Sequence, residues 1–354
     1  MVLLENEIYR AELDKINQAN NNWKKIDHHS FLIIGATGMI GSYMIDVLMR
    51  RNEKNQSNIH IYAMGRSIDR LKKRFSMYEE STFFHMVEAD VTQPFMLDKE
   101  VDYIFHGASN THPRAYATDP IGTIMTNLMG TQQVLEFAVK KKAQRVAFLS
   151  TVEIYGENRG DVEKFTEDYC GYIDCNTLRA GYPEGKRAGE SLCQAYIAKH
   201  DLDIIIPRVC RTFGPTMLLN DSKASSQFIL NAVNNEDIVL KSEGNQYFSY
   251  AYVGDVVYSL LYLLVNGEKG EAYNVAVEEF DFYLKDLAKM IANVNQKDII
   301  FSLPEEDERK GFSKASTALL DGKKLQDLGW NHLFRVDETF KNTVEIIRNE
   351  KSNV

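Results

Sequence analysis

The chain has 354 residues, of which 44% are hydrophobic and 26% are charged, and its formal net charge is −9. This length suffices for about two domains, and the composition is that of a soluble globular protein. The acidic balance argues against nucleic acid as a main partner, and no apolar run approaches the ~20 residues that a membrane span needs.

The cysteines and histidines carry little sign of special chemistry. The four cysteines form no C-x-x-C pair and no histidine cluster has metal-ligand spacing, so we expect no metal site. The N-terminus is too charged for a signal peptide, and residues 1–18 instead predict an amphipathic helix. A reduced cytoplasmic protein is the simplest interpretation.

Strands and helices alternate along the chain up to Pro207. Residues 30–51 predict an apolar strand, a glycine turn and a helix. The further predicted strands lie at 58–66, 83–92, 101–109, 145–151 and 201–209, and the further helices at 123–142 and 182–200. Apolar strands that alternate with helices indicate a parallel sheet covered on both faces, as in a doubly wound α/β Rossmann fold.

After Pro207 this alternation weakens, which predicts a smaller C-terminal α/β domain for the substrate. We expect an N-terminal helical extension at 1–29 and a cofactor-binding Rossmann domain at 30–207. The chain is expected to return to the Rossmann domain at about 251–275, with a helix starting near Asp255. The substrate domain then takes residues 208–250 and 276–354.

A glycine turn, G-x-x-G-x-x-G, follows the first predicted strand directly. Gly35 permits the tight turn, Gly38 lets the backbone approach a pyrophosphate, and Gly41 allows close packing of helix on strand. The helix N-terminus attracts the anion. We therefore expect a dinucleotide here, held by Gly35, Thr37, Gly38, Met39, Ile40 and Gly41.

The ends of the second and third strands bear on the choice of cofactor. NAD-binding proteins usually carry an acid after the second strand, but "YAMGRS" offers Arg66, which suits the 2′-phosphate of NADP. The alternative is that Arg66 is a solvated loop arginine. Asp90, followed by Val91 at the end of the third strand, is placed to contact the adenine amino group. We expect NAD, with NADP possible because of Arg66.

The segment "AGYPEGKRAGE" (180–190) places a tyrosine four residues before a lysine. On a helix Tyr182 and Lys186 would share a face, and Pro183 is tolerable there only within the first turn. A nearby cation favours the phenolate and lowers the pKa of a tyrosine. The alternative is an ordinary surface tyrosine and lysine.

Four segments together resemble one family over about residues 30–345. They are "HGASNTHPRAYATDPIGTIMTNLMGT", "STVEIYG", "YPEGKRAGESLCQAY" and "RTFGP". They are similar to those of extended short-chain dehydrogenases/reductases that modify nucleotide sugars, and most similar to UDP-glucuronate decarboxylases. The resemblance implies NAD as cofactor, a nucleotide sugar as substrate, and homodimers paired through two helices per subunit.

The resemblance also implies roles for individual residues. Tyr182 would take the proton of the sugar 4-hydroxyl, Lys186 would hold the phenolate and bind the nicotinamide ribose, and Thr151 would hydrogen-bond the same sugar oxygen. Glu153 matches a glutamate that decarboxylases share with 4,6-dehydratases. The residues expected to line the cofactor are His106, Gly107, Ala108 and Asn127, and those expected to bind substrate are Ser109, Thr151 and Arg211.

The implied chemistry is oxidation at sugar C4, where the cofactor does the work. The resulting ketone makes the neighbouring C5 position labile, so that a carboxylate on C5 leaves as carbon dioxide. The reduced cofactor then returns the hydride.

Two positions depart from the family pattern. Phe248 stands where the family usually has a substrate-contacting arginine, and Arg211 stands where it has an asparagine. The lost and gained cations can compensate, with Arg211 taking over the diphosphate. The alternative is that Arg211 is structural. The missing arginine weighs against the decarboxylase assignment in particular.

Other reactions stay open at this point. Val152 replaces an aspartate that 4,6-dehydratases need, which argues against dehydration. A 4-epimerase or 4-ketoreductase needs only Thr151, Tyr182 and Lys186, and Glu153 would then be a structural buried acid. A protein of another class, which binds NADP as a regulator without catalysis, typically lacks the tyrosine or the lysine that this chain has.

Overall fold

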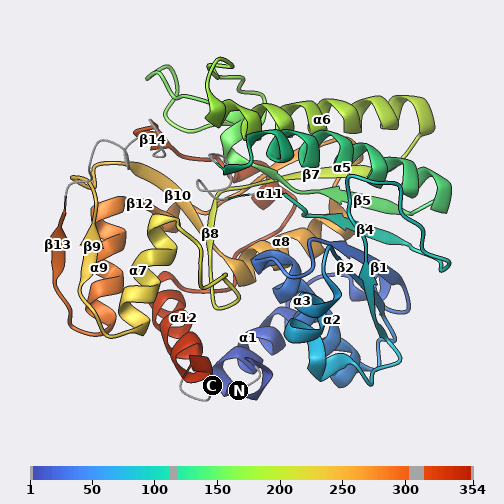
Figure 1. The fold of residues 1–354 in the computed structure, drawn as a ribbon, viewed down its shortest axis with the longest axis horizontal. Helices are drawn as coiled ribbons and strands as arrows, with labels where there is room; N and C mark the ends of the chain where they lie inside the picture. Colours follow the sequence, from blue (N-terminus) through green and yellow to red (C-terminus); the bar gives the residue numbers. More distant parts are fainter. Residues whose placement is uncertain (1–2, 110, 112–117, 303–314, 352–354) are drawn as a thin grey trace.

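The structure is a computed structural model that describes residues 3–109, 111, 118–302 and 315–351. A parallel sheet with helices on both faces forms the larger part, and a smaller group of strands and helices stands beside it (Figure 1). No helix within the described ranges is both long and apolar enough to cross a membrane.

The large sheet has the strand order β3-β2-β1-β4-β5-β7-β11, with β6 also on β7, and its pairings are parallel. This is the doubly wound order, so the predicted Rossmann fold is confirmed. The order reverses between β1 and β4, and ligands of such sheets bind outside the carboxyl ends at that point. The strands are β1 (Ser30–Ile34), β2 (His60–Gly65), β3 (Phe84–Glu88), β4 (Tyr103–His106), β5 (Arg145–Phe148), β6 (Ser150–Thr151), β7 (Ile204–Val209) and β11 (Ala272–Val275).

Helices α5 and α6 pack along each other on one face of this sheet, while α2, α3 and α8 lie on the other (Figure 1). The predicted helix around the tyrosine–lysine pair is confirmed, with Pro183 in its first turn. The helices are α2 (Met39–Asn55), α3 (Ile68–Phe75), α5 (Pro120–Lys141), α6 (Gly181–His200) and α8 (Val253–Asn266). Short 3-10 turns connect them at η2 (Trp23–Lys25), η3 (Ser76–Tyr78), η4 (Val152–Tyr155) and η5 (Leu178–Ala180).

The smaller part is built from two further sheets and the last helices. Strands β12, β10 and β14 pair in that order with β8 on β10, and β13 pairs with β9. The strands are β8 (Arg211–Phe213), β9 (Ile238–Leu240), β10 (Tyr247–Tyr252), β12 (Asp281–Tyr283), β13 (Ile299–Phe301) and β14 (Thr317–Ala318). The helices are α7 (Ala224–Val233), η6 (Glu278–Phe280), α9 (Leu284–Val294), α11 (Lys323–Asp327) and α12 (Val336–Lys351).

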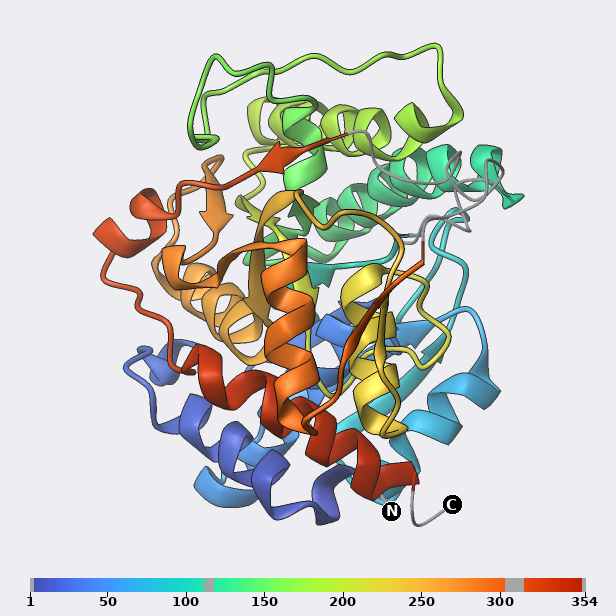
Figure 2. The same cartoon turned by 90° about the vertical axis from the view of Figure 1, so that its left-hand side faces the viewer.

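The N-terminal helix joins the two parts. After η1 (Leu3–Glu5), helix α1 (Glu7–Gln18) confirms the predicted amphipathic helix and lies beside α12 (Figures 1 and 2). The Tyr9 hydroxyl donates to Asp46 on α2 at 2.6 Å. The buried Glu12 carboxylate accepts from Tyr252 on β10 at 2.5 Å and from Asn342 on α12 at 3.0 Å. Helix α1 therefore ties the helix after the glycine turn to elements of the smaller part.

Burial of Glu12 makes the stability of this junction depend on pH. Burial raises the pKa of Glu12 from 4.5 to about 7, although the Tyr252 and Asn342 hydrogen bonds oppose the shift. Because the folded pKa is the higher one, the stability that Glu12 contributes is complete below about pH 4.5 and is lost as the pH rises through 7.

We therefore expect the free energy of unfolding of Glu12→Gln, relative to that of the parent, to increase from about pH 5 to about pH 8, by up to about 3 kcal/mol. Urea denaturation at both pH values measures this gain. Glu7→Gln, on the exposed side of the same helix, is the control and should differ from the parent equally at both pH values. A constant difference for Glu12→Gln as well would contradict the buried, protonated carboxyl.

Candidate active site

The glycine turn lies between β1 and α2, at the carboxyl edge of the sheet. Gly35 has a φ of +86°, a left-handed backbone that favours glycine, and a Cβ built on it would lie 2.9 Å from the Ala108 nitrogen. A Cβ on Gly41 would lie 2.5 Å from the Gly35 carbonyl oxygen. These two glycines let α2 start directly above β1, with Gly38 as its N-cap.

The other residues expected at the dinucleotide lie around this turn. Thr37, Met39 and Ile40 are half-buried, and the Met39 carbonyl accepts from the Thr216 hydroxyl at 2.8 Å. That bond joins the glycine turn to the chain that follows β8. The N-terminus of α2 at this turn can hold an anion such as a dinucleotide pyrophosphate.

Opposite charges mark the edge beyond β2 and β3. Arg66 and Asp90 are both exposed, one residue past the end of β2 and two residues past the end of β3. Hydrogen bonds from Thr92, one of them from its backbone at 2.9 Å, lower the pKa of Asp90, and the charge of Arg66 adds to this effect. Val91 is buried beneath, against Gly130 of α5.

The end of β4 presents its backbone rather than its histidine. His106 is buried, with Nε2 3.2 Å from the Thr131 hydroxyl of α5. Burial, with a smaller effect of Lys186, lowers the pKa of His106 to about 3, so its ring stays neutral. The ring thus faces the core, and the segment reaches the glycine turn through the backbone of Gly107 and Ala108.

A short polar chain runs from the end of β4 into α5. The Ser109 hydroxyl donates to the Asn127 side-chain oxygen at 2.9 Å. The Asn127 amide in turn donates to the Thr123 carbonyl at 2.8 Å. Asn127 is buried behind the site, and Ser109 is half-buried at its edge.

Tyr182 and Lys186 lie on one buried face of α6, as the spacing predicts. The Lys186 ammonium donates to the Leu149 carbonyl, just past β5, at 2.7 Å and stands 4.8 Å from the centroid of the Phe148 ring. Burial lowers the pKa of Lys186 to about 8. A buried lysine held by a carbonyl keeps further N–H groups for a ligand.

The phenol of Tyr182 behaves differently from the sequence expectation. Burial is the largest influence and raises its pKa, and the charge of Glu153 raises it further. A hydrogen bond with Thr151 and the charge of Arg179 act in the opposite direction but are smaller. The expectation of a lowered pKa for Tyr182 is therefore wrong for this structure, because removal from water outweighs the Thr151 hydrogen bond and the charge of Arg179.

An ion pair that the sequence analysis missed lies beside this phenol. The Arg179 guanidinium donates to Glu153 at 2.8 Å, from η5 to η4. The spacing in the sequence could have indicated it, because Arg179 lies three residues before Tyr182, which is about one helical turn.

The two departures from the family pattern are in contact with each other. β8 pairs with β10 so that Arg211 lies opposite Tyr250, and Phe248 is two residues along the same face of β10. The Arg211 guanidinium carbon stands 3.6 Å from the centroid of the Phe248 ring. Its Nη1 is buried and has no hydrogen-bond partner among the residues that the structure describes. Burial lowers the pKa of Arg211.

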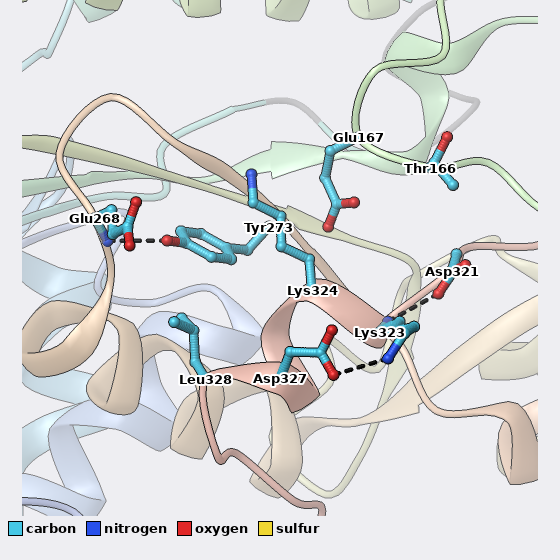
Figure 3. Close-up of a pocket in the computed structure, with 9 residues that line it drawn as sticks. All are labelled: Thr166, Glu167, Glu268, Tyr273, Asp321, Lys323, Lys324, Asp327 and Leu328. Atoms are coloured by element: carbon cyan, nitrogen blue, oxygen red, sulfur yellow. Dashed lines mark hydrogen bonds and ion pairs between the residues drawn. The ribbon is translucent and has the colours of Figure 1, made fainter.

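Two cavities lie away from these residues. One of about 450 Å³ opens beside β11 and α11, and Lys323 and Asp327 in its lining form an ion pair (Figure 3). Another of about 570 Å³ lies near Lys164 and Tyr247. Neither is lined by a predicted site residue. No group of three histidine, cysteine or acidic side chains in the described part of the chain is placed to hold a metal.

Comparison with known proteins places the chain in a family. The profile of the NAD dependent epimerase/dehydratase family matches residues 31–276. The chain belongs to this family. It is 32% identical to UDP-glucuronic acid decarboxylase 6 of Arabidopsis thaliana over 310 residues, which are 87% of this chain and 85% of the relative.

Several solved structures share its fold. The dTDP-glucose 4,6-dehydratase of Bacillus anthracis in complex with NAD has a TM-score of 0.76 at 18% identity, covering 92% of this chain and 98% of that one. The UDP-glucuronic acid 4-epimerase of Bacillus cereus, in complex with UDP-glucuronic acid and NAD, has a TM-score of 0.73 at 20% identity, covering 91% and 99%. The predicted extended short-chain dehydrogenase fold is confirmed. The prediction that the protein is an NAD-dependent enzyme that modifies nucleotide sugars is confirmed as well.

The glycine turn provides a test of this geometry. Gly35→Ala should lower the free energy of unfolding by more than the ~1–2 kcal/mol that a left-handed backbone costs an L-residue, because the new Cβ also meets Ala108. Gly160→Ala is the matched control, since Gly160 has a φ of +84° and nothing lies within 4 Å of its added Cβ. Denaturant titration compares the two variants, and equal losses would show that the turn yields easily.

Proposed function

We propose that the protein oxidises a nucleotide sugar at sugar C4 with bound NAD, and that it acts as a UDP-glucuronate decarboxylase. The observation that carries this proposal is the convergence of Thr151, Glu153, Tyr182 and Lys186 at the carboxyl edge of the sheet, beside the glycine turn. The similarity to UDP-glucuronic acid decarboxylases over most of the chain supports it.

The residues present fit the dinucleotide. Gly35 and Gly41 allow the close backbone packing that brings the N-terminus of α2 to the carboxyl edge of β1, and Lys186 lies buried. When bound, NAD supplies the hydride acceptor for sugar C4 and later the hydride donor. Asp90 and Val91 would lie at its adenine. NADP is the alternative cofactor, because Arg66 can pair with a 2′-phosphate, and titration with both dinucleotides decides between them.

Tyr182 is assigned the proton of the sugar 4-hydroxyl. Its hydroxyl bonds to Thr151, so the two oxygens can share the proton with the sugar oxygen as the C4–H bond breaks. The ketone at C4 and the carboxylate on C5 then form a β-keto acid. The bond from C5 to the carboxyl carbon breaks, carbon dioxide leaves, and the electron pair moves to the C4 oxygen. C5 then takes a proton.

Arg211 is assigned to the substrate diphosphate. Its Nη1 is buried without a hydrogen-bond partner among the described residues, which costs about 1–3 kcal/mol, and an anion would relieve that cost. The Phe248 ring covers one face of the guanidinium and leaves its edge for phosphate oxygens. Ser109 and Thr151 would contact the sugar itself.

The alternative reactions differ in what they require. A 4-epimerase or 4-ketoreductase needs only Thr151, Tyr182 and Lys186. A 4,6-dehydratase is disfavoured because Val152 is a buried apolar side chain where that reaction needs an acid. A regulatory NADP-binding protein without catalysis would show binding but no product.

We further propose a cofactor part and a substrate part with the boundaries predicted from the sequence, and a homodimer through α5 and α6. On α5, Ile121, Ile124 and Met125 are exposed apolar side chains that a second copy would cover. Sedimentation of the purified protein tests the dimer.

The four free cysteines, two of them exposed, suit a reducing cytoplasmic setting.

The catalytic assignment makes a clear expectation for Tyr182→Phe. Conversion of UDP-glucuronate, followed by product analysis beside UDP-glucose and UDP-N-acetylglucosamine, should fall by about 10²–10⁴-fold, since only the proton-transfer oxygen is lost. NAD affinity should stay within a few-fold. Tyr196→Phe is the control, because Tyr196 lies on the same helix with its hydroxyl 3.4 Å from Glu136 at the surface. Parent-like rates in Tyr182→Phe would end the proposal.

The assignment of Arg211 is tested by nucleotide binding. A hydrogen bond to a charged group contributes about 1.5–3 kcal/mol, so Arg211→Ala should weaken UDP binding by about tenfold to a hundredfold. NAD affinity should hardly change. Arg66→Ala, which removes an exposed cation from the cofactor edge, is the control and should leave UDP binding unchanged. If Arg211→Ala binds UDP as tightly as the parent, Arg211 is structural.

A further inference from the structure

We infer that Arg179 is a positioning residue for the proposed reaction: its guanidinium fixes the Glu153 carboxylate beside Tyr182 and balances the negative charge there. This inference rests on the proposed function and names a residue that the family resemblance did not supply. It starts from the ion pair between the Arg179 guanidinium and the Glu153 carboxylate, at 2.8 Å.

The pair joins two short segments that flank the phenol. Glu153 lies in η4, and its backbone N–H donates to the Thr151 hydroxyl at 3.3 Å, which places the carboxylate next to the catalytic strand end. Arg179 lies in η5, which runs directly into the helix that carries Tyr182. Both segments are short 3-10 turns, and the ion pair links one to the other near the phenol.

The charges of the pair act on Tyr182 in opposite directions. The negative charge of Glu153 raises the pKa of the phenol, and the positive charge of Arg179 lowers it. A base that must lose its proton is hindered by an unbalanced carboxylate. Arg179 therefore allows a carboxylate to remain at the reacting sugar without blocking the phenol.

The remaining charges around the phenol complete the balance. Lys186 lies one turn along the same helix, and Arg211 on β8 is close enough for the charges of both members of the pair to influence its pKa. Glu153 raises the pKa of Arg211 and Arg179 lowers it. The cluster thus has more positive than negative charge, which suits an anionic substrate.

The Glu153–Arg179 ion pair contributes little to the stability of the fold. Its side chains are 32% and 26% exposed, and partly exposed ion pairs contribute about 0–1 kcal/mol. The neighbouring Leu178 is exposed as well. Removal of Arg179 should therefore leave the fold intact, which makes an effect on the reaction measurable.

The experiment compares four variants with the parent: Arg179→Gln, Arg179→Lys, Glu153→Gln and the double variant Arg179→Gln/Glu153→Gln. Turnover of UDP-glucuronate with NAD is followed from about pH 6 to pH 9, with kcat and KM separated. Circular dichroism and titrations with NAD and UDP accompany each variant. They show whether fold and binding are kept.

For Arg179→Gln we expect the acid limb of kcat to move to higher pH, so that kcat at pH 7 falls severalfold. KM and the affinities for NAD and UDP should change little. Arg179→Lys should restore most of the rate, because it restores the charge. In the double variant the acid limb of kcat should lie near that of Glu153→Gln, since the negative charge of Glu153 that Arg179 balances is absent.

A pH profile of Arg179→Gln that matches the parent would overturn the inference, as would equal effects of Arg179→Gln with and without Glu153. If Arg179→Gln fails to fold, Arg179→Lys and the double variant still separate charge from structure. Absence of turnover in the parent would instead contradict the proposed function. The two failures are therefore distinct.

Discussion

The close approach of α6 to the end of the sheet is the constraint on which the site depends. A Cβ on Gly189 would lie 2.6 Å from the Phe148 ring, and one on Gly185 would lie 3.0 Å from the Asn127 Cβ. With no side chain at either position, α6 lies directly on β5 and α5. Only at this distance does the Lys186 ammonium reach the Leu149 carbonyl, and only then is Tyr182 buried beside Thr151.

That burial also sets the electrostatics. Removal from water raises the pKa of Tyr182 and lowers those of Lys186, His106 and Arg211. Each of these pKa shifts favours the neutral form of the side chain. A charged ligand bound here would therefore change the charge state of the site. An anionic nucleotide sugar next to Arg211 would supply negative charge, and the Glu153–Arg179 pair keeps a carboxylate there at little net cost.

Local patterns were readable from the sequence because their causes are local. The left-handed Gly35 and the helix start around Pro183 follow from backbone sterics and lie where the sequence predicts them. The Arg211–Phe248 contact needed the register of β8 against β10, and the Glu153–Arg179 pair needed two turns far apart in the chain to meet. The pKa of Tyr182 was predicted in the wrong direction because spacing shows the neighbouring cation but not the depth of burial.

The central claim is that sugar C4 gives up its hydrogen at this site under control of Tyr182. The most direct measurement uses UDP-glucuronate carrying deuterium at C4, mixed with excess NAD-loaded protein and quenched within one turnover. Mass spectrometry then follows the label. We expect deuterium in the nicotinamide ring in the parent and almost none in Tyr182→Phe. Consumption of the substrate with deuterium never leaving C4 would contradict the account.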